Sequence, residues 1–341
     1  MSLPFIRFLG PTASILGLLA LGYFGVTKGF DFSVFDEAIV AVEETGGAPT
    51  NTSLAGVEKT PDRLRIASFN IKVFGESKSS DRNVMQVLAK IFTRFDLVAV
   101  QEIRSPHARP VDKLVELINA SGHRYEATLS RSLGRTSQTE QYAYVWDTRR
   151  IQLRPQSEYV VEDSADLMHR EPFVASFQTT LIDQSRGEPF SFTLINVHTD
   201  PDEVKGDGPD NELNVLDDVF LSVREFEYAV HGEDDVILLG DLNADGEKLY
   251  ELGAIPGLDS VVGPYPTNTA GTKTYDHILL DRSTTQEFTG QAGVVDFVAH
   301  LGLTPDQAKA VSDHCPIWAE FSMYEGAATT TVAAASTTPP R

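Results

Sequence analysis

DVILLGDLNAD, residues 235–245, is an apolar run that stops at a glycine and continues into the polar side chains Asp241, Asn243 and Asp245. Its length and composition are typical of a buried strand over residues 235–242. Asp and Asn are common turn residues where a strand stops, and they are also available for chemistry there. The stretch therefore predicts a strand with acidic side chains at its end.

Seven further short apolar runs predict strands, and longer segments with helical period lie between them. The strands are expected at residues 64–71, 97–103, 142–146, 173–178, 192–198, 275–280 and 315–321. Helices are expected at residues 81–94, 111–120, 212–230 and 304–311. This alternation indicates a layered α/β protein, and the excess of strands favours two sheets packed together with helices outside.

The composition restricts how the protein could hold a polyanion. The chain has 341 residues, 41% of them hydrophobic, which suffices for one large core or two modest ones. Its formal net charge of −21 at pH 7 argues against binding nucleic acid on a broad basic face, because that mode neutralises many phosphates. A polyanionic substrate must then meet a local basic patch or metal ions. The single cysteine, Cys315, can form no intrachain disulfide and is expected to be a buried packing residue.

The two ends of the chain differ in composition from its centre. Residues 1–30 include a long apolar run behind Arg7, which predicts a signal peptide or an uncleaved transmembrane signal anchor, with a buried helix as a third interpretation. Residues 31–60 are typical of a flexible linker, and the Ala/Thr/Pro-rich residues 325–341 of a disordered tail. The catalytic domain is therefore expected at residues 61–324, outside the cytoplasm.

Polar side chains recur at the ends of the predicted strands. They are Asn70, Glu102, His198, Asp241, Asn243, Asp276, Asp313 and His314. Turn formation explains any one of them, but strand ends in a layered fold converge on one rim, so the whole set indicates a site. Oxygen ligands without a cysteine or histidine cluster favour Mg²⁺, Mn²⁺ or Ca²⁺ over zinc. The two histidines are then available for proton transfer.

Six short motifs stand in an order that resembles the endonuclease/exonuclease/phosphatase superfamily, and within it deoxyribonuclease I-like proteins. They are FNIKVFGESK (69–78), QEIR (101–104), SLGRTSQTEQY (132–142), REP (170–172), GDLNAD (240–245) and SDHCP (312–316). The resemblance covers residues 64–321. It implies a four-layer α/β sandwich of two packed mixed β-sheets flanked by helices, with the active site at one edge of the paired sheets.

The same resemblance implies roles for particular side chains. Four residues would surround a divalent metal, Mg²⁺ or Mn²⁺: Asn70, Glu102, Asp241 and Asp313. Two catalytic pairs would move protons: His198 backed by Glu140, and His314 backed by Asp276. A phosphodiester attacked by water needs a base, an acid and a cation near the developing charge, and this set supplies the groups for all three.

Substrate contacts follow from the resemblance as well. Asn243 would touch the reacting phosphate, Arg104 would enter the DNA minor groove, and Arg170 would contact a phosphate. Lys72 and Arg135 would add positive charge beside the cleft.

Two positions depart from the family pattern. Gln138 stands where the family nuclease has a tyrosine that packs against a sugar, so the strandedness of the substrate stays open. Residues 267–269 partly resemble a structural calcium loop, which makes Ca²⁺ a further candidate ion. The loop lacks the expected acidic partner upstream, near Tyr265.

The leading functional hypothesis is metal-dependent endonucleolytic hydrolysis of DNA, with nucleic acid as the partner and no protein partner inferred. A phosphodiesterase or phosphatase of the same superfamily that acts on lipid head groups or inositol phosphates is the rival enzyme, and an uncleaved membrane segment would favour it. A catalytically silent surface binding module is the third hypothesis, and it predicts the loss of at least one of these residues.

Overall fold

One seven-stranded sheet contains both β2, which carries Asn70, and β3, which carries Glu102. The computed structural model describes residues 50–52, 59–105, 109–137, 139–180, 184–206 and 208–326. In spatial order the strands of this sheet are β1 (Thr50–Thr52), β13 (Phe288–Val295), β14 (Ile317–Ser322), β2 (Arg63–Phe74), β3 (Leu97–Ile103), β5 (Gln141–Asp147) and β4 (Tyr125–Leu129). The β2–β3 pair is parallel, whereas β14–β2 and β3–β5 are antiparallel, so the sheet is mixed.

The second sheet holds the strand that opened the sequence analysis. Its order is β11 (Leu258–Ser260), β12 (Asp276–Asp281), β10 (Val236–Asp241), β9 (Ser191–His198), β8 (Phe173–Thr179) and β6 (Ile151–Leu153), with β7 (Tyr159–Val160) also paired to β8. Only the β9–β10 pair among these is parallel. This sheet is therefore mixed as well.

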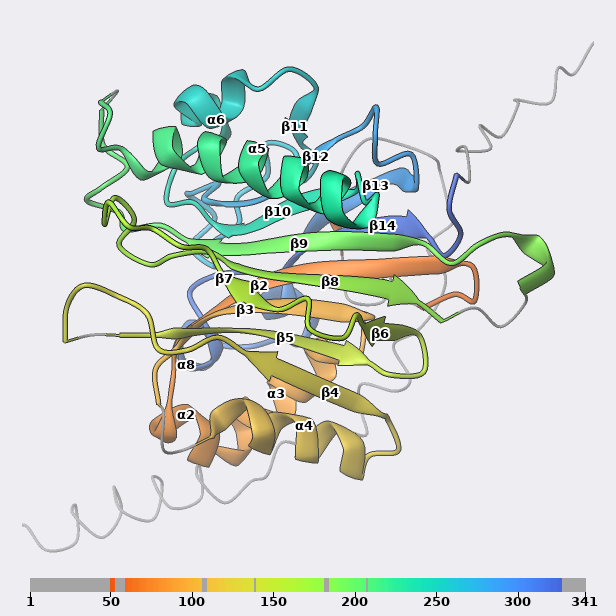
Figure 1. Ribbon diagram of the computed structural model, residues 1–341. Helices are drawn as coiled ribbons and strands as arrows, with labels where there is room; N and C mark the ends of the chain where they lie inside the picture. The colour runs from red at the N-terminus through yellow and green to blue at the C-terminus, as the bar shows by residue number, and fades with distance from the viewer. Residues whose placement is uncertain are drawn as a thin grey trace, which may run out of the picture. The chain divides into compact units, whose positions relative to one another are not determined.

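Helices cover the outer faces of the two sheets, as Figure 1 shows. On the side of the first sheet lie α2 (Glu76–Ser80), α3 (Arg82–Phe92), α4 (Pro110–Ala120) and α8 (Pro305–Val311), while the one-turn α7 (Phe297–His300) follows β13. On the side of the second sheet lie α5 (Glu212–His231) and α6 (Tyr250–Ala254). Single 3₁₀ turns occur at Gln184–Arg186, between β8 and β9, and at Gly246–Lys248, before α6. The four-layer sandwich expected from the sequence is confirmed.

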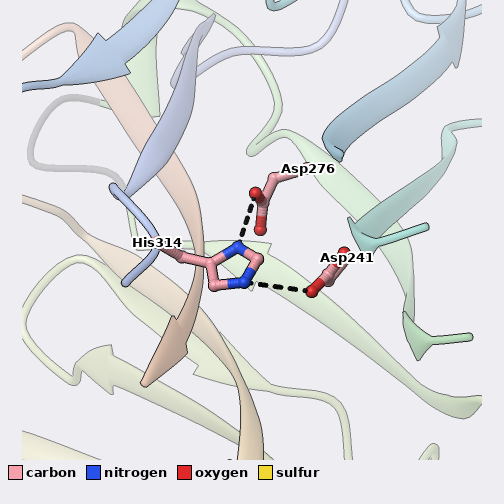
Figure 2. A group of neighbouring side chains, drawn as sticks. All are labelled: Asp241, Asp276 and His314. Carbon is pink, nitrogen blue, oxygen red and sulfur yellow. Dashed lines mark hydrogen bonds and ion pairs between the residues drawn. The ribbon is translucent and has the colours of Figure 1, made fainter. Parts of the chain in front are cut away.

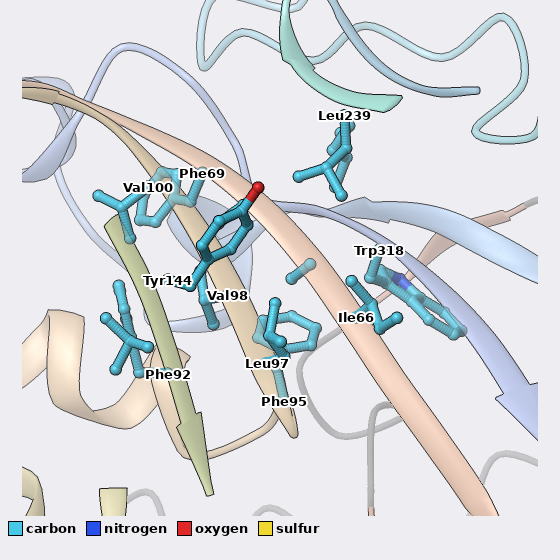
Figure 3. Close-up of a cluster of buried hydrophobic side chains, with 14 of the residues drawn as sticks. Ile66, Phe69, Phe92, Phe95, Leu97, Val98, Val100, Tyr144, Leu239 and Trp318 are labelled. Carbon is cyan, nitrogen blue, oxygen red and sulfur yellow. The ribbon is translucent and has the colours of Figure 1, made fainter. Parts of the chain in front are cut away.

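The alternation of side chains along β10 explains why that strand must lie inside the sandwich. Ile237 and Leu239 belong to the larger apolar cluster, which also contains Phe69 of the first sheet, and Figure 3 shows part of it. Val236 and Leu238 point the other way, into the cluster that contains Phe220 of α5. Since burying such a side chain stabilises the fold by about 1.5–3 kcal/mol, both faces of the strand drive its burial.

The eight predicted strands and four predicted helices are present, with bounds that differ by up to three residues. The sequence analysis did not predict β1, β4, β6, β7, β11 or β13, nor the short helices α2, α6 and α7. Inside the predicted linker, residues 50–52 form β1 and pair with β13, so this short part of the segment is strand instead of linker. The predicted start of the tail, residue 325, is two residues too early. The amides of Glu325 and Gly326 still donate to Glu188 and Glu287 of the folded domain.

The predicted signal segment, residues 1–30, and the tail from residue 327 lie outside the described residues. Among the residues that the structure does describe, no helix is long and apolar enough to cross a membrane.

Candidate active site

Strand register brings the predicted site residues together at one edge of the two sheets. Asp241, the last residue of β10, is level with His198 at the end of β9 and with Asp276 at the start of β12. In the facing sheet, Asn70 of β2 is level with the residue before Glu102 on β3. Parallel strands end at the same edge and antiparallel neighbours begin there, so hydrogen-bond register aligns the residues within each sheet. The packing of the two sheets then brings Asn70 to Asp241.

The first histidine–carboxylate pair is His198 with Glu140. Nδ1 of His198 lies 2.7 Å from Oε1 of Glu140, and both side chains are buried. Arg170 and Arg104 stand beside the same carboxylate, at 3.2 and 3.4 Å. Burial alone would raise the pKa of Glu140, but His198 and the two arginines lower it, so the carboxylate is ionised. Burial alone would lower the pKa of His198, and the adjoining Glu140 raises it above the usual range.

The second pair is His314 with Asp276, shown in Figure 2. Nδ1 of His314 lies 2.9 Å from Oδ2 of Asp276, and the hydroxyl of Thr267 donates to that same oxygen at 2.6 Å. Burial opposes ionisation of His314, but Asp276 and Asp241 outweigh it and raise the pKa to about 10. Thr267, the first residue of the segment that partly resembles a calcium loop, thus holds Asp276 in place.

Asp241 lies between the two pairs. Its Oδ2 is 3.7 Å from Nε2 of His198 and 3.5 Å from Nε2 of His314, and it accepts a hydrogen bond of 3.0 Å from Asn70. The glycine before it is required, because a Cβ at Gly240, where φ is +149°, would lie 1.8 Å from the carbonyl oxygen of Val197. The close approach of β9 and β10 therefore depends on this glycine and sets the distance between Asp241 and His198.

Glu102 is held in a backbone conformation that non-glycine residues seldom adopt. Its φ is +60°, and Lys72, Val73 and Asn243 around the same edge also have positive φ values. Oε1 of Glu102 accepts from Asn70 at 3.2 Å, and Oε2 accepts from the Val73 amide at 2.9 Å. Strained backbone that persists in an ordered structure gathers at functional sites, and here it gathers beside the predicted metal ligands.

A cleft of about 600 Å³ opens above these residues. Nine of the predicted site residues line it directly: Lys72, Glu102, Arg104, Arg170, His198, Asp241, Asn243, Asp313 and His314. Asn70, Glu140 and Asp276 lie buried behind this lining. Arg135 lies in a neighbouring hollow, 2.5 Å from Glu203, and Gln138 lies outside the described residues.

Most of the Arg170 side chain lies beneath the wall of the cleft, and little of it is exposed to a substrate. Its side chain is buried and donates to the carbonyl oxygens of His198 and Thr199 at 2.9 and 3.0 Å, as well as facing Glu140. Lys72 pairs with Asp313, and Asn243 donates to the carbonyl oxygen of Thr199 at 2.9 Å. Lys72 and Arg104 are therefore the more exposed basic groups on the cleft wall.

The sequence analysis missed several cleft residues. His169, Asp200, Pro201, Thr136 and Ser137 line the same cleft. Each lies within three residues of a predicted one, and His169 and Asp200 have residue types that could have signalled them. Thr136, Ser137 and Pro201 have no residue type or spacing that would single them out.

The donor set fits a hard divalent cation. The Asn70 amide nitrogen donates to an oxygen of Glu102 and to one of Asp241, which brings these two carboxylates close together. Oδ1 of Asn70 accepts from the Lys72 amide, and Oδ1 of Asp313 lies 4.0 Å from Nε2 of His314. Among the described residues, Oδ1 of Asp313 has no hydrogen-bond partner. A second set, Asp241 with Asp276 and His314, also has its donor atoms within 4.8 Å of one another. Asp241 belongs to both sets, and the carboxylate-rich set suits Mg²⁺, Mn²⁺ or Ca²⁺ better, since His314 already binds Asp276.

Cys315, next to His314, is a packing residue, as expected. Its side chain is 5% exposed, and burial raises the pKa of the thiol, so it is not a thiolate near neutral pH. We expect Cys315→Ala to keep at least about half of the wild-type turnover, because a single methyl-sized change in a core is tolerated when the site is untouched. Native protein should also resist iodoacetamide. Loss of activity with an intact thermal transition, or rapid alkylation, would instead assign the thiol a chemical role.

Comparison with known proteins shows which family and fold this chain resembles. The model of a family described as Endonuclease/Exonuclease/phosphatase family matches residues 67–314. Deoxyribonuclease-1-like 1 of Chlorocebus aethiops is 33% identical over 275 residues, which cover 77% of this chain and 85% of that protein. Deoxyribonuclease-1 of Bos taurus is 29% identical over 283 residues, covering 78% and 94%. The solved endonuclease/exonuclease/phosphatase of Bacteroides vulgatus matches with a TM-score of 0.51 at 14% identity, covering 78% of this chain and all of that one, which supports the fold alone.

Proposed function

Because the chain belongs to the endonuclease/exonuclease/phosphatase family, we propose that it is an endonuclease that hydrolyses phosphodiester bonds of DNA with the help of a divalent cation. Two histidine–carboxylate pairs whose free imidazole nitrogens both face Asp241 are the observation that carries the proposal. Such an arrangement gives a base and an acid on either side of one reacting atom.

The two imidazoles are oriented by their carboxylates. Glu140 and Asp276 each hold the Nδ1 proton, so Nε2 is the nitrogen that meets the substrate in both rings. A neutral imidazole there removes a proton from the attacking water, and the protonated imidazole of the other pair gives one to the departing oxygen. The negative charge of Asp241, within 4 Å of both rings, stabilises whichever ring is protonated.

The cation has a definite place in this proposal. Glu102 and Asp241 would hold it with Asn70 and Asp313, and when bound it would neutralise the charge that develops on the phosphate. Asn243, two residues after Asp241, is the group proposed to contact the phosphate directly.

The preference for DNA rests on two kinds of support. The relatives at about 30% identity carry deoxyribonuclease names. In a chain of net charge −21, the cleft wall also carries Lys72 and Arg104 among its carboxylates, and these two basic groups are the ones available to meet a phosphate. We further propose that the catalytic domain comprises residues 61–324 together with residues 325–326 and strand β1, and that residues 1–30 direct it out of the cytoplasm.

The full chain should nick supercoiled plasmid in Mg²⁺ plus Ca²⁺ and lose this activity in a chelator. Plasmid, single-stranded DNA and RNA tested side by side would define the substrate. If a folded protein cleaved none of them but released phosphate from inositol phosphates or lipid head groups, the nuclease proposal would be wrong and the rival enzyme correct.

Glu102→Gln tests the cation separately. It removes one negative oxygen ligand at nearly the same side-chain shape, and its single carbonyl oxygen can accept from Asn70 or from the Val73 amide but not from both. The Mg²⁺ concentration for half-maximal nicking should therefore rise about tenfold or more. Glu116→Gln, on the exposed face of α4, makes the same change in charge and should leave the titration unchanged. An unchanged Mg²⁺ titration in the Glu102 variant would remove that residue from the cation site.

A further inference from the structure

Glu212, the first residue of α5, is a carboxylate beneath the wall of the catalytic cleft, and its side chain is fully buried. Its Oε1 accepts a hydrogen bond from the amide of His169 and its Oε2 accepts one from the amide of Asp200, both at 2.5 Å. These amides belong to two separate segments, one before β8 and one after β9. One side chain therefore ties two segments of the chain to the start of a helix.

Both segments build the wall of the cleft, where His169 and Asp200 line it. Arg170 follows directly in the first segment. Its guanidinium donates to the carbonyl oxygen of His198 at 2.9 Å and lies 3.2 Å from Oε1 of Glu140. In the second segment, His198 stands two residues before Asp200. A shift of either amide therefore reaches the His198–Glu140 pair through only one or two residues.

The Glu212 side chain does not cap its own helix. That role belongs to Asn211, whose side chain accepts from the amide of Leu213. Burial raises the pKa of Glu212 to about 7, against the two amide hydrogen bonds and the nearby Arg170, which lower it. A buried carboxylate is costly to fold unless its oxygens are hydrogen-bonded. Capping of α5 therefore does not explain this side chain, whereas the two cleft segments that it holds do.

We propose that Glu212 is a positioning residue of the proposed nuclease, whose carboxylate fixes the two cleft segments so that Arg170 keeps His198 and Glu140 in their reactive arrangement. The inference rests on the proposed function, because it gives this contact a purpose in the same reaction. An ionised carboxylate accepts at both oxygens, and its hydrogen bonds are roughly twice as strong as those of a neutral group. A misplacement of about 1 Å at reacting groups can cost about a hundredfold in rate.

Glu212→Gln keeps the shape of the side chain but removes one acceptor. Its carbonyl oxygen can hold one amide, while its NH₂ group faces the other amide and releases it. We expect the kcat for plasmid nicking to fall by about tenfold to a hundredfold. The KM for plasmid and the Mg²⁺ concentration for half-maximal nicking should stay within about twofold of the wild type, because the buried side chain does not reach the substrate.

Glu227→Gln is the matched control, since it makes the same change at a second buried glutamate of α5. Glu227 is 1% exposed and accepts from the hydroxyls of Tyr159 and Ser176. It stands about 22 Å from Glu212 along the axis of the helix. This variant should keep the wild-type kcat. If both variants lost turnover only in proportion to a lower Tm, Glu212 would be an ordinary structural residue and the proposal would be wrong.

A second variant keeps the proposal testable if glutamine prevents folding. Glu212→Asp retains both charged oxygens on a side chain that is one methylene shorter, so it cannot hold both amides in their present places. Its kcat should fall by about threefold to tenfold with an unchanged KM. A folded Asp variant with the wild-type kcat would show that the place of the carboxylate does not matter, and would overturn the proposal.

Two readouts that need no turnover separate this proposal from the proposed function. In the Gln variant, hydrogen exchange at the amide of His169 or Asp200 should speed up by at least about tenfold, and the NMR signal of the His198 Nδ1 proton should shift. If the wild type nicked no plasmid but these signals changed, the proposed function would be wrong while Glu212 would still position the His198–Glu140 pair. Unchanged exchange and an unchanged His198 signal in the folded variant would overturn the proposal.

Discussion

Asp241→Asn is expected to slow plasmid nicking by at least about a thousandfold, the largest single effect we predict. The carboxylate has three neighbours that matter for the reaction. It lies 3.7 Å from His198 and 3.5 Å from His314, and it accepts a hydrogen bond from Asn70. An amide at this position removes the negative charge that favours a protonated imidazole on either side, and it weakens the proposed cation site at the same time.

The loss should be chemical and not structural. Asp241 is almost fully buried and burial raises its pKa, so an uncharged isostere is cheaper to fold than the carboxylate it replaces. The variant should therefore melt at or above the wild-type temperature in the absence of metal. Glu247→Gln, an exposed change in the 3₁₀ turn that follows the same motif, is the matched control and should keep full activity. Nicking within tenfold of the wild type by the Asp241 variant would contradict the shared role of this carboxylate.

Part of the candidate site could be predicted from local sequence because several of its residues sit where strands end, whereas Glu140 and the residue roles came from the family resemblance. GDLNAD, LINVHTD and TYDHILL each show an apolar run meeting a polar residue, and register then places Asp241, His198 and Asp276 side by side. Both periodicity and residue type are local properties of the sequence. The convergence of the strand ends follows from the layered fold, which local patterns also indicate.

What could not be predicted depends on long-range packing. β13 has the sequence FTGQAGVV, in which two glycines and a glutamine interrupt the apolar pattern. This segment is held in strand conformation by its antiparallel pairing with β14. Arg170 is a polar residue in a predicted loop, so nothing local indicates that it is buried against Glu140 and the carbonyl oxygens of His198 and Thr199. The amides that Glu212 holds lie 43 and 12 residues earlier in the chain, and they meet it only because α5 packs over the second sheet.

His198→Ala and His314→Ala should each lower turnover by at least about a hundredfold, since each removes one proton-transfer group. The double variant should lose less than the product of the two single losses, because groups that act on one transition state are not additive. His231→Ala, an exposed histidine at the end of α5, provides the control. Near-wild-type rates in both single variants would refute proton transfer by these residues.

Substitutions of the supporting carboxylates separate orientation from chemistry. Glu140→Gln and Asp276→Asn leave both imidazoles in the cleft but remove the charge that raises their pKa values. We expect each to lose about tenfold to a hundredfold in turnover, less than the corresponding histidine variant. The pKa of the affected imidazole, followed by NMR titration, should fall. Because a purely structural carboxylate would leave that pKa unchanged while lowering the Tm, the two measurements together distinguish a positioning role from simple support of the fold.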